Sequence, residues 1–122
     1  MSLLDMVMTV VALSGYYEVD PVYAINIVTL ESSWDPNAIG DGGKAVGLWQ
    51  WHLKSWEYVR EKMKLPLDDL RTDPYEATRT ALYAIGVLDL ERWWSTAEKA
   101  IKMKVNLQDE ISVKERPHTR PY

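Results

Sequence analysis

The chain has 122 residues, 47% of them hydrophobic, so it is long enough for one domain with a packed core and too short for two. Its net charge is −4, and no block of Lys and Arg residues precedes the C-terminal tail, so the basic surface that is typical of nucleic-acid-binding proteins is missing. The sequence has no cysteine, so it forms neither a disulfide nor a thiolate metal site. No run reaches the ~18 apolar residues that are needed to span a membrane.

Two helices are predicted in the first third of the chain. Apolar residues repeat at helical spacing through residues 3–11, and Gly15 is expected to end this helix. Asp20 and Pro21 are typical of a helix start, with Asp as the N-cap and Pro at the first helical position. The apolar stripe of this second helix leads to Glu31, which is therefore expected to point inward near its C-terminal end.

A long loop is predicted after the second helix. Residues 34–47 contain four glycines together with Asp, Asn and Pro, and a loop of this length is often functional. The helical pattern returns from His52 to Lys64 and ends before Pro66, because a residue that precedes proline is disfavoured in a helix.

A further helix is predicted from Asp73 and Pro74, which repeat the start signal of the second helix. Its helical pattern is expected to continue to about Met103. Residues 106–122 are expected to form an irregular tail. Because no internal repeat or linker is found, a single domain is predicted over residues 1–122.

Glu31 is the most informative ionisable residue of the sequence. Burial on the apolar stripe and the negative end of the helix dipole both disfavour its charged form. No Lys or Arg lies within twelve residues on either side to offset these effects. A raised pKa is therefore expected, and a general acid needs such a pKa. The alternative is a carboxylate that reaches solvent at a frayed helix end.

Two linked motifs resemble those of the lytic transglycosylase and goose-type lysozyme family. Residues 31–38 read ESSWDPNA and residues 45–50 read AVGLWQ, similar to the family's Glu-Ser-x-aromatic-x-Pro-x-Ala and Gly-Ala-x-Gly-Leu-x-Gln. The sequence departs from the second motif at Lys44, where many members have Gly or another small residue. The resemblance covers roughly residues 10–90. It implies an all-α, lysozyme-like fold of about five to seven helices, with a substrate cleft between the helix of Glu31 and the loop at 34–50.

The resemblance implies that Glu31 is the general acid for the β-1,4 bond between N-acetylmuramic acid and N-acetylglucosamine in peptidoglycan. As a base, it would then deprotonate the muramoyl 6-hydroxyl in a transglycosylase, which gives a 1,6-anhydro end, or a water in a hydrolytic lysozyme. The transglycosylase is favoured, because the substrate's own acetamido group can stabilise the intermediate without a second carboxylate.

Other motif positions are expected to contact the substrate. The resemblance implies that Ser32 and Gln50 orient the acid or bind sugar, and that Gly47 and Leu48 bring backbone polar groups close to the glycan. Trp49 is a candidate for stacking on a sugar ring.

A hydrolase often needs a second carboxylate, and Asp41 and Asp35 in the loop are the candidates. Their alternative role is that of turn and cap residues. The loop does not fit a calcium site, because Ile39 and Val46 stand where oxygen ligands are needed. The two histidines lack acidic ligand spacing, so neither a metal ion nor another cofactor is expected.

The expected activity is that of a cell-wall-degrading glycosidase whose partner is the glycan strand of peptidoglycan. The N-terminus lacks the basic region of a signal peptide. We therefore expect synthesis in the cytoplasm and delivery to the bacterial wall by a phage, as an endolysin that depends on a holin or as part of a virion. The alternative is a bacterial protein that is exported by other means. The competing interpretation is a non-catalytic lysozyme-like module that binds glycan or builds a virion. It is favoured by the lack of the family's Tyr-Asn-x-Gly motif after Trp94.

Overall fold

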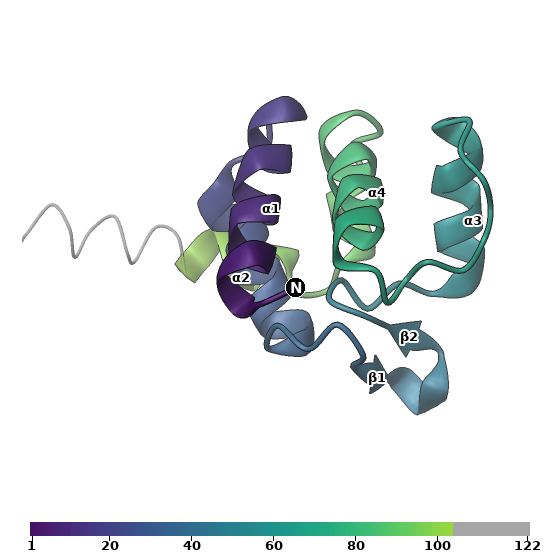
Figure 1. Ribbon diagram of the computed structural model, residues 1–122. Coiled ribbons are helices and arrows are strands. Elements are labelled where there is room, and N and C mark those ends of the chain that lie inside the picture. Colours follow the sequence, from purple (N-terminus) through teal and green to yellow (C-terminus); the bar gives the residue numbers. More distant parts are fainter. Residues whose placement is uncertain (104–122) are drawn as a thin grey trace, which may run out of the picture.

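The computed structural model describes residues 1–103, most of which are helical (Figure 1). The main α-helices are α1 (Leu3–Tyr16), α2 (Pro21–Ser32), α3 (Leu53–Lys62) and α4 (Pro74–Gly86). The short strands are β1 (Ile39–Gly40) and β2 (Ala45–Val46), and the 3-10 turns are η1 (Asp41–Gly43) and η2 (Glu91–Trp93). Residues 97–103 are helical again. The predicted all-α class is confirmed for the described part of the chain.

Side-chain caps place the helix starts where the sequence predicts them. Asp20 caps α2 by accepting hydrogen bonds from the backbone N–H groups of the second and third helical residues, at 2.8 and 3.3 Å. Asp73 caps α4 in the same way, at 2.9 and 3.3 Å. The first helix begins with a capping box between Ser2 and Asp5. Each cap satisfies N–H groups that have no partner inside the helix.

The helices pack around α4, which contacts both α1 and α3, and α1 also contacts α2 (Figure 1). Their shared core is closed by fully buried side chains from each helix, namely Val10, Ile27, Trp56, Val59 and Leu82. Edge-to-face contacts join the ring of Trp51 to those of Trp56 and Trp94, with centroids 5.8 and 5.1 Å apart. This aromatic cluster links the segment before α3 to the chain after α4.

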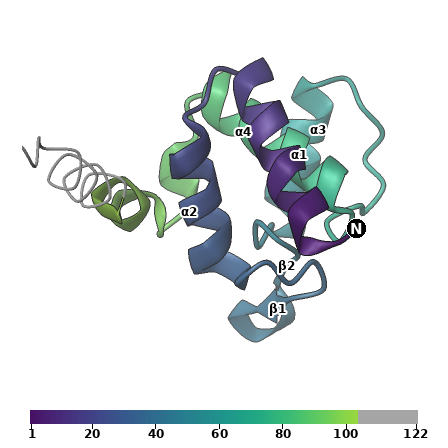
Figure 2. The ribbon, with the colours of Figure 1, turned by 60° about the vertical axis from the view of Figure 1, so that its left-hand side comes forward.

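The loop predicted at residues 34–47 contains a short antiparallel hairpin. Ile39 pairs with Val46, and Gly40 pairs with Ala45. The hairpin lies beyond the C-terminal end of α2 (Figure 2). Each strand has only two residues, which is too short to produce the alternating pattern that predicts a strand.

The prediction of one helical pattern to about Met103 is wrong, because α4 ends at Gly86. A Cβ atom on Gly86 would lie 2.5 Å from the backbone oxygen of Tyr17, so the chain passes very close to the end of α1. Asp89 then has a positive φ of 55°. The resulting turn leads to η2 and to the separate helical segment at 97–103.

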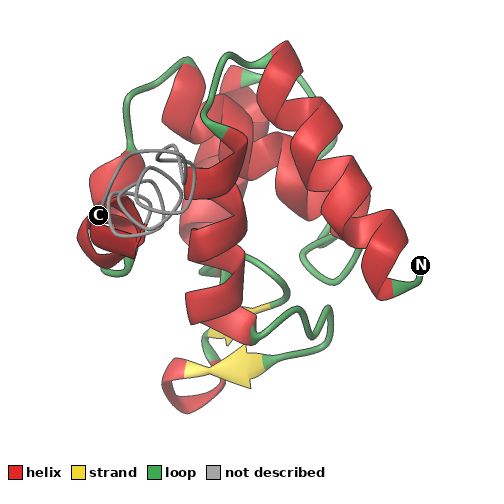
Figure 3. Cartoon of the chain, turned by 90° about the vertical axis from the view of Figure 1, so that its left-hand side faces the viewer, coloured by secondary structure: helices red, strands yellow, loops and turns green. Residues whose placement is uncertain are grey.

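The tail predicted at residues 106–122 lies outside the described residues. In the part of the chain that is described, no helix has the length and apolar character to cross a membrane. The hairpin occupies one end of the helical body, next to the end of α2 (Figure 3). The candidate site is built around this end of α2.

Candidate active site

A cavity of about 320 Å³ lies where four parts of the chain meet. Glu31 lines it from the last turn of α2, and Asp41 and Gln50 line it from the hairpin and the turn that follows. Ser55 contributes from the first turn of α3, and residues 93–95 contribute from the chain after α4. The volume lies at the lower end of the range found for small-molecule sites in proteins.

Glu31 is half-buried in this cavity, as its place on the helix stripe predicts. Burial raises the pKa of Glu31 above its ordinary value, and the hydrogen bond from the Thr96 hydroxyl to Oε2 lowers it by a smaller amount. The oxygen atoms of this bond are 2.5 Å apart. None of the ion pairs between described residues includes Glu31. The carboxyl group therefore holds its proton to a higher pH than an exposed glutamate.

The backbone turns sharply after Glu31, because Ser33 and Trp34 both have positive φ angles of 50° and 67°. The Ser32 hydroxyl donates to the carbonyl of Val28 and accepts from the N–H of Trp34, both at 3.2 Å. Ser32 therefore fixes the end of the helix that carries the carboxyl group. No hydrogen bond between Ser32 and Glu31 is found in the described residues, so any orienting effect acts through the backbone.

Gln50 lines the cavity and also holds the hairpin together. Its Nε2 donates to the carbonyls of Ala38 at 3.1 Å and Gly47 at 2.9 Å. A Cβ atom on Gly40 would lie 2.5 Å from Oε1 of Gln50, so this side chain packs tightly against β1. The structure thus brings Gln50 and Glu31 to the same cavity, with the Gln50 amide engaged by the backbone.

The structure places Gly47, Leu48 and Trp49, three predicted substrate contacts, in the interior, and their contacts with substrate stay predictions. The side chains of Trp49 and Leu48 are 0% and 1% exposed, and the indole N–H of Trp49 donates to the hydroxyl of Thr78 at 3.0 Å. A Cβ atom on Gly47 would lie 2.0 Å from the carbonyl oxygen of Arg71, so this glycine permits a close backbone approach. The three residues are buried and do not line the cavity.

The two candidate second carboxylates have different surroundings. Asp41 lies at the cavity, where its Oδ2 is 3.1 Å from Nε2 of His52, and both side chains are exposed. Asp35 is exposed outside the cavity, and its Oδ1 accepts from the N–H of Asn37 at 2.9 Å. Asp35 therefore has the alternative role of a turn residue, and Asp41 stays as the candidate.

The chain after α4 contributes to the site in a way that sequence patterns do not indicate. Trp93, Trp94 and Ser95 line the cavity, and Thr96 contacts Glu31. The indole N–H of Trp94 donates to a backbone carbonyl in the core at 2.8 Å, which fixes this wall. The two adjacent tryptophans could have drawn attention to this segment in the sequence. The contact of Thr96 with Glu31 could not have been predicted, because the two residues are 65 positions apart.

The polar groups at the cavity can donate, accept or hold a proton. They comprise the half-buried carboxyl group of Glu31, the exposed pair of Asp41 and His52, and the hydroxyls of Ser55 and Ser95. In the described residues, no group of three His, Cys, Asp or Glu side chains is arranged to hold a metal ion.

The family model described as Transglycosylase SLT domain matches residues 9–102 of the chain. The matched segment includes both motifs around the cavity and extends through η2 and past Thr96. No curated protein matches the sequence significantly.

Proposed function

Since the chain belongs to the family of transglycosylase SLT domains, we propose that it cleaves peptidoglycan as a lytic transglycosylase, with Glu31 as its single general acid and base. Family membership implies cleavage of glycosidic bonds in peptidoglycan. The observation that carries the finer assignment is the half-buried carboxyl group of Glu31, whose pKa is raised by burial and which faces a cavity of about 320 Å³.

In the first step, the carboxyl proton of Glu31 passes to the glycosidic oxygen while the bond between that oxygen and C1 of the muramoyl residue breaks. The N-acetylglucosamine part leaves as an alcohol. The electron deficiency at C1 is met by the carbonyl oxygen of the substrate's own acetamido group, which forms a bond to C1. The raised pKa keeps the proton available for this step.

In the second step, the Glu31 carboxylate removes the proton of the muramoyl 6-hydroxyl. The oxygen of that hydroxyl bonds to C1 and displaces the acetamido oxygen, which gives a 1,6-anhydro end. Glu31 is protonated again and ready for another cycle. One group can serve as acid and then as base when its pKa lies near the working pH.

A hydrolytic lysozyme is the closest competing mechanism, and it would use a water in place of the 6-hydroxyl. Asp41 is the candidate to position such a water, because it lines the cavity. The Asp41 carboxylate is exposed, and its Oδ2 lies 3.1 Å from Nε2 of His52. This contact supports a mechanism in which Asp41 has no catalytic role.

A gel that contains peptidoglycan tests the activity. We expect a zone of clearing with the wild-type protein and none with Glu31→Gln, which keeps the size of the side chain and removes the acid. The rate is expected to fall by roughly 10²- to 10⁴-fold, which is the usual contribution of a general acid. If the wild-type protein binds peptidoglycan without clearing it, the alternative of a non-catalytic glycan-binding or structural virion module replaces the proposal.

Mass spectrometry of the digest tests the reaction type. We expect muropeptides with 1,6-anhydro ends, and we expect Asp41→Asn to release the same products at a rate close to that of wild type. Reducing ends, together with a large loss of rate in Asp41→Asn, would instead assign the hydrolytic mechanism.

We also propose that a phage delivers the protein to the wall, within a virion or through a holin. The net charge of −4 supports assisted delivery, because peptidoglycan is itself anionic and repels a free acidic protein. Purified protein is then expected to bind isolated sacculi weakly at low salt and more strongly as salt screens the repulsion. Binding that weakens as salt is added would contradict this argument.

A further inference from the structure

Two exposed aromatic side chains lie next to each other at the edge of the cavity. Trp93 lines the cavity and is 42% exposed, and Tyr58 on α3 is 47% exposed. Their ring centroids are 5.8 Å apart at an interplanar angle of 58°. Large aromatic residues usually bury most of their surface, so an exposed pair beside a cavity is a candidate binding surface.

Tyr58 lies on a face of α3 that begins at the cavity. Ser55, Tyr58 and Lys62 follow one another at spacings of three and four residues, which places them on the same face of the helix. Ser55 lines the cavity, and Lys62 is exposed with its Nζ 5.2 Å from the centre of the Tyr58 ring. This face of α3 therefore carries Ser55 at the cavity, then the Tyr58 ring, and then the Lys62 ammonium group.

The core does not require these two rings. The neighbouring positions Trp94 and Val59 are buried, at 6% and 0% exposure, and fill the interior from the same two segments. The interior is thus filled without Trp93 and Tyr58, whose rings stay exposed. Rings with one apolar face open to water can bind a ligand that also has an apolar face.

We propose that Tyr58, Trp93 and Lys62, here called the aromatic shelf, bind a further part of the glycan strand that leaves the catalytic cavity at the edge lined by Trp93. The rings would lie against the apolar faces of pyranose units, and Lys62 would contact a carboxylate of the attached peptide. A cation suits this place, because an anionic ligand would otherwise meet a protein of net charge −4. The inference rests on the proposed function, since it takes the glycan strand of peptidoglycan as the ligand.

The test measures binding in the Glu31→Gln background, so that the ligand is not cleaved. Two probes are used: soluble peptidoglycan fragments that carry peptide carboxylates, and neutral chitooligosaccharides. We expect Trp93→Ala and Tyr58→Ala to weaken the binding of both probes about 3- to 10-fold, which is the size of a stacking contact. Lys62→Gln is expected to weaken only the binding of the carboxylate-bearing fragments.

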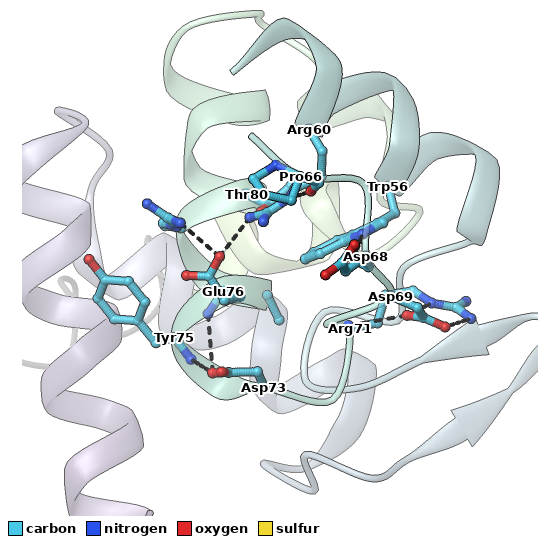
Figure 4. A network of polar contacts seen from close by, with 12 residues as sticks. Trp56, Arg60, Pro66, Asp68, Asp69, Arg71, Asp73, Tyr75, Glu76 and Thr80 are labelled. Carbon is cyan, nitrogen blue, oxygen red and sulfur yellow. Dashed lines mark hydrogen bonds and ion pairs between the residues drawn. The ribbon is translucent and has the colours of Figure 1, made fainter. Parts of the chain in front are cut away.

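The chain offers a matched control in Tyr75, which is 43% exposed and has the guanidinium of Arg79 5.6 Å from its ring centre. This pair has the same spacing as Tyr58 and Lys62, and it lies at the start of α4 on the side of α1 (Figure 4). Tyr75→Ala is expected to bind both probes as the parent does. Tyr58→Phe should also keep its affinity, because it retains the ring.

The outcomes separate this inference from the proposed function. If wild type clears peptidoglycan and the shelf variants bind both probes as tightly as the parent, the aromatic shelf is not a glycan site. If wild type fails to clear peptidoglycan, the proposed activity is wrong, while weaker binding by the shelf variants still supports the shelf. A Tyr75→Ala variant that loses as much affinity as Tyr58→Ala would also overturn the inference.

Discussion

The carboxyl group of Glu31 and the hydroxyl of Thr96 meet in a 2.5 Å hydrogen bond, although the two residues are 65 positions apart in the sequence. This bond joins the last turn of α2 to the chain that follows η2 and so connects two walls of the cavity. It also opposes the effect of burial on the pKa of Glu31, because a donated hydrogen bond stabilises the carboxylate form. The position of the carboxyl group and its proton affinity therefore depend on the same contact.

Replacement of Thr96 by Val is expected to raise the pKa of Glu31 further, because burial remains and the stabilising hydrogen bond is lost. The alkaline limb of the pH–activity profile, set by loss of the Glu31 proton, should move to higher pH. We also expect the maximal rate to fall about 10-fold, since the carboxyl group is less well fixed. Thr96→Ser keeps the hydroxyl and should restore both properties. An alkaline limb that stays in place or moves to lower pH would contradict this role for Thr96.

Gly47 and Gly42 form a matched pair for testing the hairpin. Both have positive φ, 86° and 64°, but a Cβ atom on Gly47 would lie 2.0 Å from the carbonyl oxygen of Arg71, whereas one on Gly42 meets nothing within 4 Å. Gly47→Ala is therefore expected to lower the free energy of unfolding by about 3 kcal/mol, from the clash and the strained backbone together. Gly42→Ala should cost only about 1 kcal/mol.

Urea denaturation followed by circular dichroism measures both variants. The backbone at Arg71 cannot move aside easily, because its side chain donates to the carbonyls of Lys44 at 3.1 Å and Trp51 at 3.0 Å. Equal losses of stability in Gly47→Ala and Gly42→Ala would show that the close approach to Arg71 is unimportant.

The helical frame follows from local signals in the sequence, whereas part of the site does not. Asp20, Asp73 and the apolar stripe of α2 act within a few residues, so the start of α2 and α4 and the inward position of Glu31 are predictable. The need for a glycine at position 86, the last residue of α4, comes from the close approach of Tyr17, which lies far away in the sequence. The pattern of apolar residues within a helix cannot predict a contact with a distant segment.

The motif resemblance located the cavity without showing which motif residues face it. Gln50 lines the cavity, whereas Trp49 next to it is fully buried and bonded to Thr78. Both residues lie in the same motif, and the packing of the whole core decides which of them reaches the surface. Trp93 lines the cavity and Thr96 contacts Glu31 through tertiary structure, which a spacing argument from the sequence cannot predict.

A buried ion network between α3 and α4 is expected to stabilise the frame of the site (Figure 4). Arg60, 1% exposed, donates to Glu76 at 2.8 Å, and Arg79 donates to the same carboxylate oxygen at 2.8 Å. Glu76→Gln leaves the buried charge of Arg60 without its counter-ion, so we expect a loss of about 3 kcal/mol in unfolding free energy. The exposed pair of Glu98 and Lys102 is the control, and Glu98→Gln should change stability little.

The same network has a predictable pH dependence. Burial alone would raise the pKa of Glu76, but the hydrogen bonds from Arg79 and Arg60 outweigh burial and hold this pKa below its ordinary value of 4.5. The stabilising contribution is therefore present above pH 4.5 and lost as the pH falls through the folded-state pKa. Thermal melts from neutral pH down to about pH 3 should show wild type and Glu76→Gln converging. A constant difference between them would contradict the assignment.

Glu31 should have the opposite linkage, because its pKa is raised in the folded state. Well below pH 4.5 the carboxyl group is protonated in both the folded and the unfolded state and costs no stability. As the pH rises, the unfolded chain loses the proton first, so folding is increasingly disfavoured until the folded-state pKa is passed. Glu31→Gln removes this effect, so its melting temperature should gain on that of wild type as the pH rises from 4.5 through the folded-state pKa of Glu31. Because the comparison subtracts the other titrating groups, a difference in melting temperature that stays constant with pH would show that Glu31 ionises as easily in the folded protein as in water, and the acid step would lose its physical basis.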